Sequence, residues 1–443
     1  MLSAFRTELR PTIAIAVPVV LAELGWVSMG MVDTLMVGRL GADAIGAVGL
    51  ASMLFFAVSV FAMGLLLGLD PLVAQAFGAG HIEECHRWLV QGLWMGAIVT
   101  VPSLAMIFGM DASLAAWGLP DGVLRLSRPY LAILTWSLLP LLAYVAFRRY
   151  LQAMTLVRPV TITLVAANIV NAIGNWIFIF GHWGMPALGV RGSAYSTLVA
   201  RAFMALALLG VIVANERRVS PTLRGTPSHL DRARLRRLFG IGLPAAGQTV
   251  LEVGVFAAAT ALAGRVSAQA LAAHQIALNF AAFTFMVPFG MASAAAVRVG
   301  HAIGRRDRPG AAAAGWTAIA LGVGFMAAAA VVFLAAPRLL IRAFTSDRAV
   351  IETGATLLFV AAVFQLFDGL QGVTTGALRG LGNTRTAMVW NLGGHWLIGL
   401  PLGYVLCFNR HFGVVGLWWG LSAGLMICGV ALVIVWERHT RFV

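Results

Sequence analysis

Apolar residues occur in long runs along this chain, and short polar stretches separate one run from the next. A helix needs roughly 20 apolar residues to cross the hydrocarbon core of a bilayer, which is about 30 Å thick. Each run is at least that long, so the pattern predicts twelve transmembrane helices. They are expected near residues 11–37, 44–78, 88–110, 123–150, 158–181, 188–214, 236–263, 270–303, 311–338, 350–379, 385–408 and 412–436.

The stretch from Asn215 to Arg237 is the one plainly hydrophilic interruption, and it divides the chain into nearly equal parts. We therefore expect an N-lobe of helices 1–6 over residues 1–214, a cytoplasmic linker over 215–235 and a C-lobe of helices 7–12 over 236–443. The predicted fold class is an all-α polytopic membrane protein with two pseudo-symmetric six-helix bundles.

Composition agrees with a membrane protein. Apolar residues make up 60% of the 443 and charged residues only 11%, too few to cover a water-soluble fold. The net charge of +14 does not indicate nucleic-acid binding, because the arginines lie between the apolar runs and form no basic stripe. Their positions suit contact with anionic lipid. Three scattered cysteines provide neither a disulfide framework nor a metal site.

The arginines also predict how the chain is oriented. With twelve spans both termini lie on one side, and the loops of that side hold about twenty arginines against about nine on the other. Positive residues collect in cytoplasmic loops. We expect a multi-pass protein of the bacterial inner membrane with both termini and the linker in the cytoplasm.

The two halves resemble each other at an offset of 226 residues. Pro18 corresponds to Pro244 and Gly64 to Gly290, and the pairs Gly38 with Gly264, Arg39 with Arg265 and Gly78 with Gly304 keep the same offset. Two six-helix bundles of parallel topology, related by an axis along the membrane normal, are typical of transporters that open to either side in turn. Proline frees a backbone carbonyl and permits a bend, so Pro18 and Pro244 are candidate hinges; static kinks are the alternative.

Ionisable side chains in mid-span are costly to insert and are functional candidates for that reason. The acids at such positions are Glu23, Asp33, Asp70, Glu252 and Asp368. Through the repeat, Asp33 corresponds to a position two helical turns beyond Glu252 on the same face. We predict that Asp33 and Glu252 face one cleft; the alternative for Asp33 is a simple bond to an asparagine of a neighbouring helix.

Two of these acids lie four residues from a phenylalanine, in the pairs Glu252 with Phe256 and Asp368 with Phe364. An anion beside an aromatic ring on one helical face suits a lipophilic cation by charge and by cation–π attraction. We predict that Phe256, Phe364 and Asp368 bind substrate, although aromatic pairs at this spacing also occur as ordinary packing.

The acids are also the candidates for ion coupling. A carboxyl group in a low-dielectric cleft can load and release a proton, and Glu252 with Asp368 can instead provide oxygen ligands for Na⁺. Asn171 and Asn175, again four apart, can bond Asp33 and complete its surroundings, or can hold helices together. The residues leave Na⁺ and H⁺ coupling both open.

Other function classes lack their motifs. There is no GxxxxGK[ST] for a nucleotide, and neither HExxH nor GxSxG for hydrolysis, so we expect an ion gradient to supply the energy, with no cofactor and no enzymatic activity. His274 and His395 lie within spans without a paired catalytic motif. A flippase for lipid or lipid-linked oligosaccharide has a similar helix count and is the alternative function; its cavity would be basic, and the acids argue against it.

Several motifs in their order along the chain make it resemble the multidrug and toxic compound extrusion (MATE) transporters, in particular the NorM-like bacterial branch. They are Val32-Asp33-Thr34 with Gly38, the run Gly64 to Gly80 with Gln75, Arg149 to Gln152, Arg158-Pro159, Asn171 to Trp176, Pro244 with Glu252, and Asp368 with Leu378-Arg379-Gly380.

This resemblance implies a two-lobed antiporter, acting as a monomer, that exports lipophilic cationic drugs or dyes in exchange for Na⁺ or H⁺ by alternating access. It implies that Asp33, assisted by Asn171 and Asn175, is protonated in the N-lobe, and that Glu252 and Asp368 form the cation site of the C-lobe. Asn175 stands where another branch has an acid, which makes a Na⁺ site in the N-lobe less secure.

Overall fold

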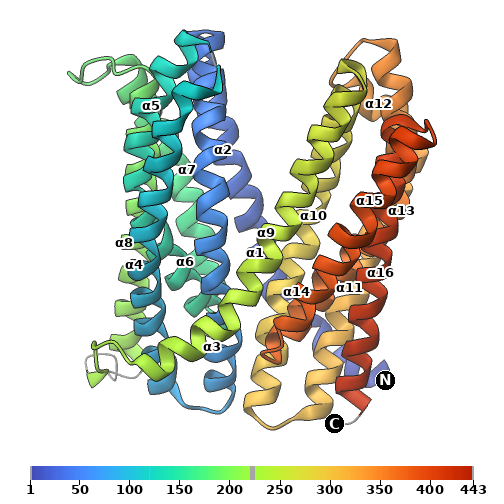
Figure 1. The fold of residues 1–443 in the computed structure, drawn as a ribbon. Coiled ribbons are helices and arrows are strands. Elements are labelled where there is room, and N and C mark those ends of the chain that lie inside the picture. The colour runs from blue at the N-terminus through green and yellow to red at the C-terminus, as the bar shows by residue number, and fades with distance from the viewer. Residues whose placement is uncertain (1, 119, 220–224, 442–443) are drawn as a thin grey trace. The chain divides into compact units, whose positions relative to one another are not determined.

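Helices occupy the predicted runs in the computed structural model, which describes residues 2–118, 120–219 and 225–441 and contains no strand within them (Figure 1). The first half comprises α1 (Leu2–Val37), η1 (Gly38–Leu40), α2 (Ala42–Leu65), η2 (Leu66–Gly68), α3 (Leu69–Gly78), α4 (Ile82–Ser113), η3 (Leu114–Trp117), α5 (Asp121–Trp136), α6 (Leu138–Ala153), α7 (Val157–Phe180) and α8 (Val190–Val219). The second comprises α9 (Arg232–Val266), α10 (Ala268–Gly304), α11 (Arg308–Ala335), α12 (Pro337–Arg342), α13 (Arg348–Gly380), α14 (Arg385–Asn391), η5 (Leu392–Gly399), α15 (Leu400–Tyr404), η6 (Val405–Asn409) and α16 (Gly413–Arg441).

All twelve predicted spans correspond to helical segments, although two are not single regular helices. Among the described residues, 10 helices are long and apolar enough to cross a membrane, and α5 with α6 forms an eleventh that bends by 44°. The bend coincides with Pro140, which cannot donate a hydrogen bond to the carbonyl of Trp136. The eleventh predicted span alternates α-helical and π-helical turns from α14 to η6.

The chain forms two compact units. The N-terminal unit is Leu21–Ala246, and the C-terminal unit is made of the described residues of Met1–Val20 and Gly247–Val443. Compared with the expected lobes, the first part of α1 belongs to the C-terminal unit and the first part of α9 to the N-terminal unit. The chain therefore passes from one unit to the other inside these two helices.

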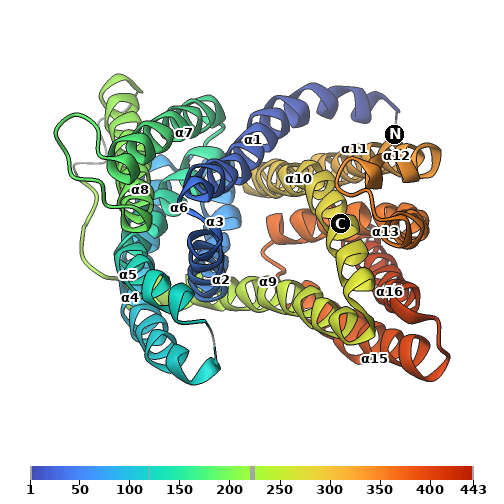
Figure 2. The ribbon, with the colours of Figure 1, turned by 90° about the horizontal axis from the view of Figure 1, so that it is seen from above.

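Each unit is a bundle with its own apolar core. In the N-terminal unit, α8 packs against α5, α6 and α7, and the buried core includes Leu66, Leu138 and Leu208. In the C-terminal unit, α10, α11, α13 and α16 lie side by side, as the view along the helices shows (Figure 2). α13 contacts each of the other three, so it is the central helix of this unit.

The two crossing points are equivalent under the repeat. The units divide after Val20 in α1 and after Ala246 in α9, positions that differ by 226. A Cβ atom added to Gly64 would lie 2.6 Å from the Cα of Ala246, and one added to Gly290 would lie 3.1 Å from the backbone nitrogen of Val20. In each unit, the helix that enters from the other unit therefore packs closely against a glycine. Gly64 contacts α9 and Gly290 contacts α1, at equivalent repeat positions where a side chain has no room.

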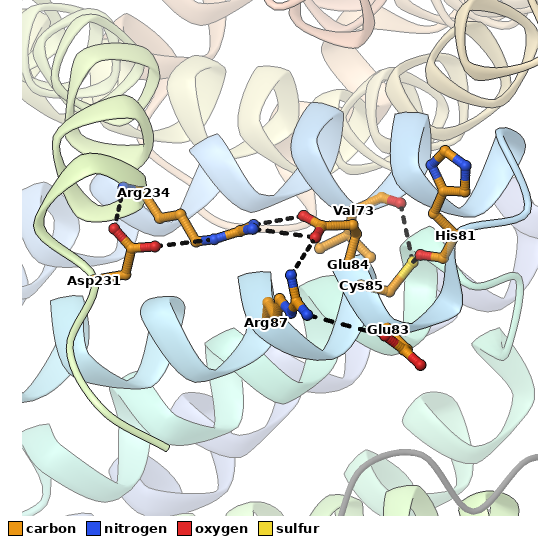
Figure 3. A network of polar contacts seen from close by, with 8 residues as sticks. All are labelled: Val73, His81, Glu83, Glu84, Cys85, Arg87, Asp231 and Arg234. Carbon is orange, nitrogen blue, oxygen red and sulfur yellow. Dashed lines mark hydrogen bonds and ion pairs between the residues drawn. The ribbon is translucent and has the colours of Figure 1, made fainter. Parts of the chain in front are cut away.

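An ion pair fixes the first part of each crossing helix. Arg298 on α10 donates two hydrogen bonds to one carboxylate oxygen of Glu8 at 2.7 and 3.0 Å and a third to the other oxygen at 2.8 Å. Arg234 on α9 donates to Glu84 on α4 at 2.5 and 3.1 Å and to Asp231 at 3.1 Å (Figure 3). Glu8 and Arg234 also differ by 226, so equivalent positions of the repeat carry opposite charges.

The polar segment before α9 is tied to α4 as well. Gln91 donates to the carbonyl of His229 at 3.1 Å and accepts from the backbone N–H of Asp231 at 3.0 Å, and Trp94 donates to the carbonyl of Ser228 at 2.9 Å. A cavity of about 510 Å³ lies beside this junction and is lined by parts of α3, α4 and the start of α9. These contacts explain why the start of α9 belongs to the N-terminal unit.

Candidate functional site

Asp33 lies in the N-terminal unit, on the part of α1 beyond the crossing, and its side chain is buried. Asn175 on α7 donates to one carboxylate oxygen at 2.6 Å, and the hydroxyl of Thr197 on α8 lies 3.1 Å from the other. The second N–H of Asn175 points to the side-chain oxygen of Asn171 at 3.3 Å. Asp33 is thus surrounded by donors, as an ionised carboxylate requires. The predicted grouping of Asp33, Asn171 and Asn175 is present.

Arg201 is a buried cation in the same unit, and its charge acts on Asp33. It donates to the hydroxyl of Ser137 at 2.5 Å, and its guanidinium carbon lies 4.6 Å from the ring centre of Phe55 and 6.0 Å from that of Trp26. Within the described part of the chain no carboxylate oxygen lies within ion-pair distance of it. Aromatic faces and a hydroxyl therefore provide much of its surroundings.

Two of the mid-span acids are held in ion pairs within the N-terminal unit. Glu23 on α1 pairs with Arg148 on α6, and Asp70 on α3 pairs with Arg149 at 3.5 Å; all four side chains are buried. Removing one partner of such a pair leaves an uncompensated charge in an apolar interior. Glu23 and Asp70 thus each have a counter-charge in an ion pair, whereas Asp33 is held by hydrogen bonds from Asn175 and Thr197.

The other two acids lie together in the C-terminal unit. Asp368 on α13 is buried, Glu252 on α9 is half-buried, and the two are close enough for their charges to interact. The amide of Gln371, one turn after Asp368, lies beside the carboxyl group of Glu252. No arginine or histidine of the described residues forms an ion pair with either acid. This site therefore has two acids without a counter-charge.

Aromatic rings adjoin the acid pair on the same helices. Phe256 and Phe364, each four residues from an acid, meet edge to face with their ring centres 6.1 Å apart. Phe364 also contacts Trp418 of α16 at 5.8 Å. Phe364 is buried, whereas Phe256 is half-buried. The structure thus brings together the four predicted C-lobe residues, two carboxyl groups and two rings, in one unit.

Sequence reasoning missed three members of these sites. Thr197 bonds Asp33, Ser137 bonds Arg201, and Gln371 adjoins Glu252. A polar stripe at four-residue spacing, Ser193, Thr197 and Arg201, marked the buried face of α8 and could have revealed the first. Among the described residues, no three His, Cys, Asp or Glu side chains are grouped closely enough to hold a metal ion. A cation at Glu252 and Asp368 would need amide or backbone oxygens in addition.

The MatE family matches the chain twice, over residues 18–177 and again over 244–405. The two matches begin at Pro18 and Pro244, so they reproduce the internal repeat and its offset. Together they cover most of each unit, including Asp33, Glu252 and Asp368.

Curated relatives match nearly the whole chain. A "Probable multidrug resistance protein NorM" of Mesorhizobium japonicum is 36% identical over 99% of this chain and 95% of its own length. Another of that name, of Rhodopseudomonas palustris, is 39% identical over 99% and 94%. Among solved structures, the eukaryotic MATE transporter AtDTX14 has a TM-score of 0.86 at 20% identity, covering 99% of this chain and 98% of that one. This protein is therefore a membrane transporter and no enzyme, and it belongs to the MATE family, in its NorM-type multidrug efflux branch.

Proposed function

We propose that this transporter is a secondary active antiporter that exports organic cations in exchange for Na⁺ or H⁺ by alternating access. The observation that carries the proposal is the pair Glu252 and Asp368, two acids in one apolar bundle without a counter-charge among the described residues. Burying two ionised carboxyl groups together is strongly unfavourable unless a cation or protons neutralise them. The pair therefore favours binding a positive charge.

The neighbouring rings support an organic cation as the exported substrate. Phe256 and Phe364 present an aromatic edge and face one helical turn from the acids. A flat lipophilic cation gains cation–π attraction there as well as the charge of the carboxylates. The same carboxylates can take protons or Na⁺ after the substrate leaves, so that ion and drug bind in alternation.

Asp33 is proposed as a second coupling group, one that exchanges protons. Its partners can adapt to either state: the hydroxyl of Thr197 lies 3.1 Å from Asp33 and equally 3.1 Å from the carbonyl of Ser193. The hydroxyl has one proton, which it gives to the ionised carboxylate or, once Asp33 is protonated, to the carbonyl. No buried donor therefore loses its hydrogen-bond partner when Asp33 gains or releases a proton.

Dye export from proteoliposomes tests the proposal. Purified protein is reconstituted with ethidium, and an inward H⁺ gradient or an inward Na⁺ gradient is imposed alone. We expect at least one gradient to drive export, and Asp33→Asn or Asp368→Asn to abolish it. Glu352→Gln, which alters an exposed ion pair on the same helix as Asp368, is the matched control and should export normally. Unchanged export in both site variants would refute the site assignment.

The hinge at Pro18 and Pro244 is part of the proposal. Each proline lies two residues before the point where its helix passes from one unit to the other. Proline removes the N–H that would bond one turn back, which weakens the helix at that point. The ion pairs of Glu8 and Arg234 fix the first part of each helix to its host unit. Bending between the units is then concentrated near the prolines.

Alanine at these positions separates a hinge from a static kink. Because proline inside a helix costs about 3 kcal/mol, Pro18→Ala or Pro244→Ala should leave thermal stability equal or higher. If the prolines are hinges, the transport rate falls several-fold while ethidium binding is kept. Transport at the wild-type rate in both variants would favour static kinks.

We also propose an orientation in the membrane and a monomeric state. The arginine distribution supports a place in the bacterial inner membrane with both termini and the linker in the cytoplasm. A reporter enzyme that is active only outside the cytoplasm, fused to the C-terminus, should be inactive. Size-exclusion chromatography with light scattering should show one chain per detergent micelle if the transporter is a monomer.

A further inference from the structure

Two histidines are fully buried in the C-terminal unit, and their surroundings differ. His274 on α10 accepts a hydrogen bond at Nδ1 from the indole N–H of Trp418 at 3.0 Å. Indole only donates, so the proton of His274 is on Nε2, which lies 3.0 Å from the hydroxyl of Thr260. That hydroxyl in turn donates to the carbonyl of Phe256 at 2.9 Å. His274 is a satisfied structural residue.

His395 has no such arrangement. Neither of its ring nitrogens has a hydrogen-bond partner among the described residues, and the same holds for both amide atoms of Asn391. The two side chains are 0% exposed, and they lie four residues apart on one helical face. A buried polar group without a hydrogen-bond partner destabilises the fold, so neither residue has a stabilising explanation.

His395 adjoins an aromatic ring of the acid site, and Asn391 lies one turn earlier on the same helix. The ring of His395 lies 6.5 Å from that of Phe256, and the indole of the adjacent Trp396 donates to the carbonyl of Leu251 at 2.9 Å. These contacts fix α9 against η5. The two helices run in the same direction (Figure 1). Asn391 precedes His395 by one turn as Glu252 precedes Phe256, and this places Asn391 at the level of the acids.

We propose that Asn391 and His395 are substrate-contacting residues that determine specificity: they bind the hydrogen-bonding groups of an organic cation whose charge is held by Glu252 and Asp368. This inference rests on the proposed function of that acid pair. Asn391 offers two N–H donors and a carbonyl, and neutral His395 offers one donor and one acceptor. The preferred substrate is then a flat aromatic cation with amino or carbonyl substituents.

The backbone around these residues supports the assignment. His395 lies in η5, a run of π-helical turns, and Asn391 lies directly before it. π-Helical turns are rare, pack less closely than α-helix and are often located at functional sites. A return of η5 to α-helical geometry would rotate the residues after Asn391 about the helix axis and give a ligand access to groups that are closed off in this conformation.

Two probes distinguish this role from a general effect on the site. Proflavine is a flat cation with two amino groups, whereas tetraphenylphosphonium is a lipophilic cation that cannot form hydrogen bonds. Binding of each to purified protein is measured by fluorescence or equilibrium dialysis. We expect His395→Phe and Asn391→Leu to weaken proflavine binding at least tenfold and to change tetraphenylphosphonium binding less than twofold. Equal loss for both probes, or no loss for either, overturns the proposal.

Thermal unfolding gives a readout that does not depend on transport. His395→Phe and Asn391→Leu remove polar atoms without partners, so the melting temperature should stay equal or rise. His274→Phe is the matched control: it leaves the buried Trp418 N–H without its acceptor and removes the bond to the Thr260 hydroxyl, so the melting temperature should fall. A fall of equal size in His395→Phe would assign His395 a structural role instead.

The proposed function can fail separately. If wild-type protein binds both probes but neither gradient drives export, the antiport proposal fails, and the binding comparison still decides the role of Asn391 and His395. If wild-type binds and exports both and the variants discriminate as expected, both proposals stand.

Discussion

The two units contain the same kind of helix bundle, but the charges around their buried acids differ. In the N-terminal unit, Asp33 is surrounded by hydrogen-bond donors and lies near the buried cation Arg201. In the C-terminal unit, Glu252 and Asp368 lie together, and none of the described residues provides them with a counter-charge. The position equivalent to Glu252 is Trp26, whose ring lies 6.0 Å from the guanidinium of Arg201. The repeat thus preserved the framework of prolines and glycines, while the charges around the buried acids diverged.

This difference suits the N-terminal unit for proton exchange and the C-terminal unit for binding a cation. An acid beside a fixed positive charge offers little to Na⁺ or a drug cation, but it can still exchange a proton. Two acids without such a charge favour a mobile cation. We therefore expect the C-terminal unit to bind the substrate, and the two sites should respond differently to the following changes.

The largest expected effect distinguishes paired from unpaired acids by stability. Glu23→Gln leaves Arg148 as a buried charge without its partner and should lower the free energy of unfolding by about 3–5 kcal/mol. Asp368→Asn removes no ion pair and should leave stability equal or higher. Thermal melts of the purified variants measure both, and replacing Glu23 and Arg148 together with Leu and Met should recover much of the loss.

Giving the C-terminal unit a fixed cation should abolish its function. Gln371 lies beside Glu252, so Gln371→Arg would place a guanidinium against the carboxyl groups and form strong charge-assisted bonds. We expect ethidium export to fall about 100-fold, in line with losing more than one charged interaction. Gln371→Leu controls for loss of the amide and should retain most of the activity. Normal export by Gln371→Arg would contradict the role of the acid pair.

Removing the fixed cation from the N-terminal unit should have a smaller effect. Arg201→Met keeps the contacts with Phe55 and Trp26 but removes the charge near Asp33 and so changes its affinity for protons. Export driven by a pH gradient should fall about tenfold, the factor that corresponds to roughly 1.4 kcal/mol, with a changed pH profile. Arg201→Lys should restore the wild-type profile. A profile unchanged in Arg201→Met would remove Arg201 from the coupling site.

The smallest effect concerns the exposed junction before α9. The backbone N–H of Arg234 donates to Asp231 and holds the pKa of this carboxyl group below its usual range. Because the pKa of Asp231 is lower in the folded than in the unfolded state, the ionised carboxylate stabilises the fold at pH values above the unfolded-state pKa. This stabilisation is lost as the pH falls through the folded-state pKa. Asp231→Asn should therefore lower the melting temperature slightly at pH 7, and the difference from wild type should shrink as the pH falls below the unfolded-state pKa. An effect that grows toward acid pH would have the wrong sign.

Periodicity and composition predicted the features that depend on local sequence. The twelve spans, the duplicated halves and the shared helical face of Asn171 and Asn175 follow from apolar runs, from a shared offset and from four-residue spacing. Pairing across long separations could not be predicted in this way: Arg148 lies 125 residues from Glu23, and single-helix patterns do not fix which faces meet.

The sequence also did not reveal where the units divide. The hydrophilic stretch from Asn215 to Arg237 looked like the boundary, because polar linkers usually join lobes. In the structure the end of this stretch is bonded to α4, and the units divide inside two apolar helices instead. The π-helical turns of η5 were equally hidden, since their side chains are as apolar as those of an ordinary span.

The bond between Glu8 and Arg298 has a consequence for biogenesis. The two residues are 290 positions apart, so the first helix leaves the ribosome long before its anchor exists. At about 5–20 residues per second, roughly 15–60 s of synthesis separate them. Until Arg298 is made, the start of the first helix has no unit to pack against. The N-terminal half of the protein, made alone, would always lack this partner.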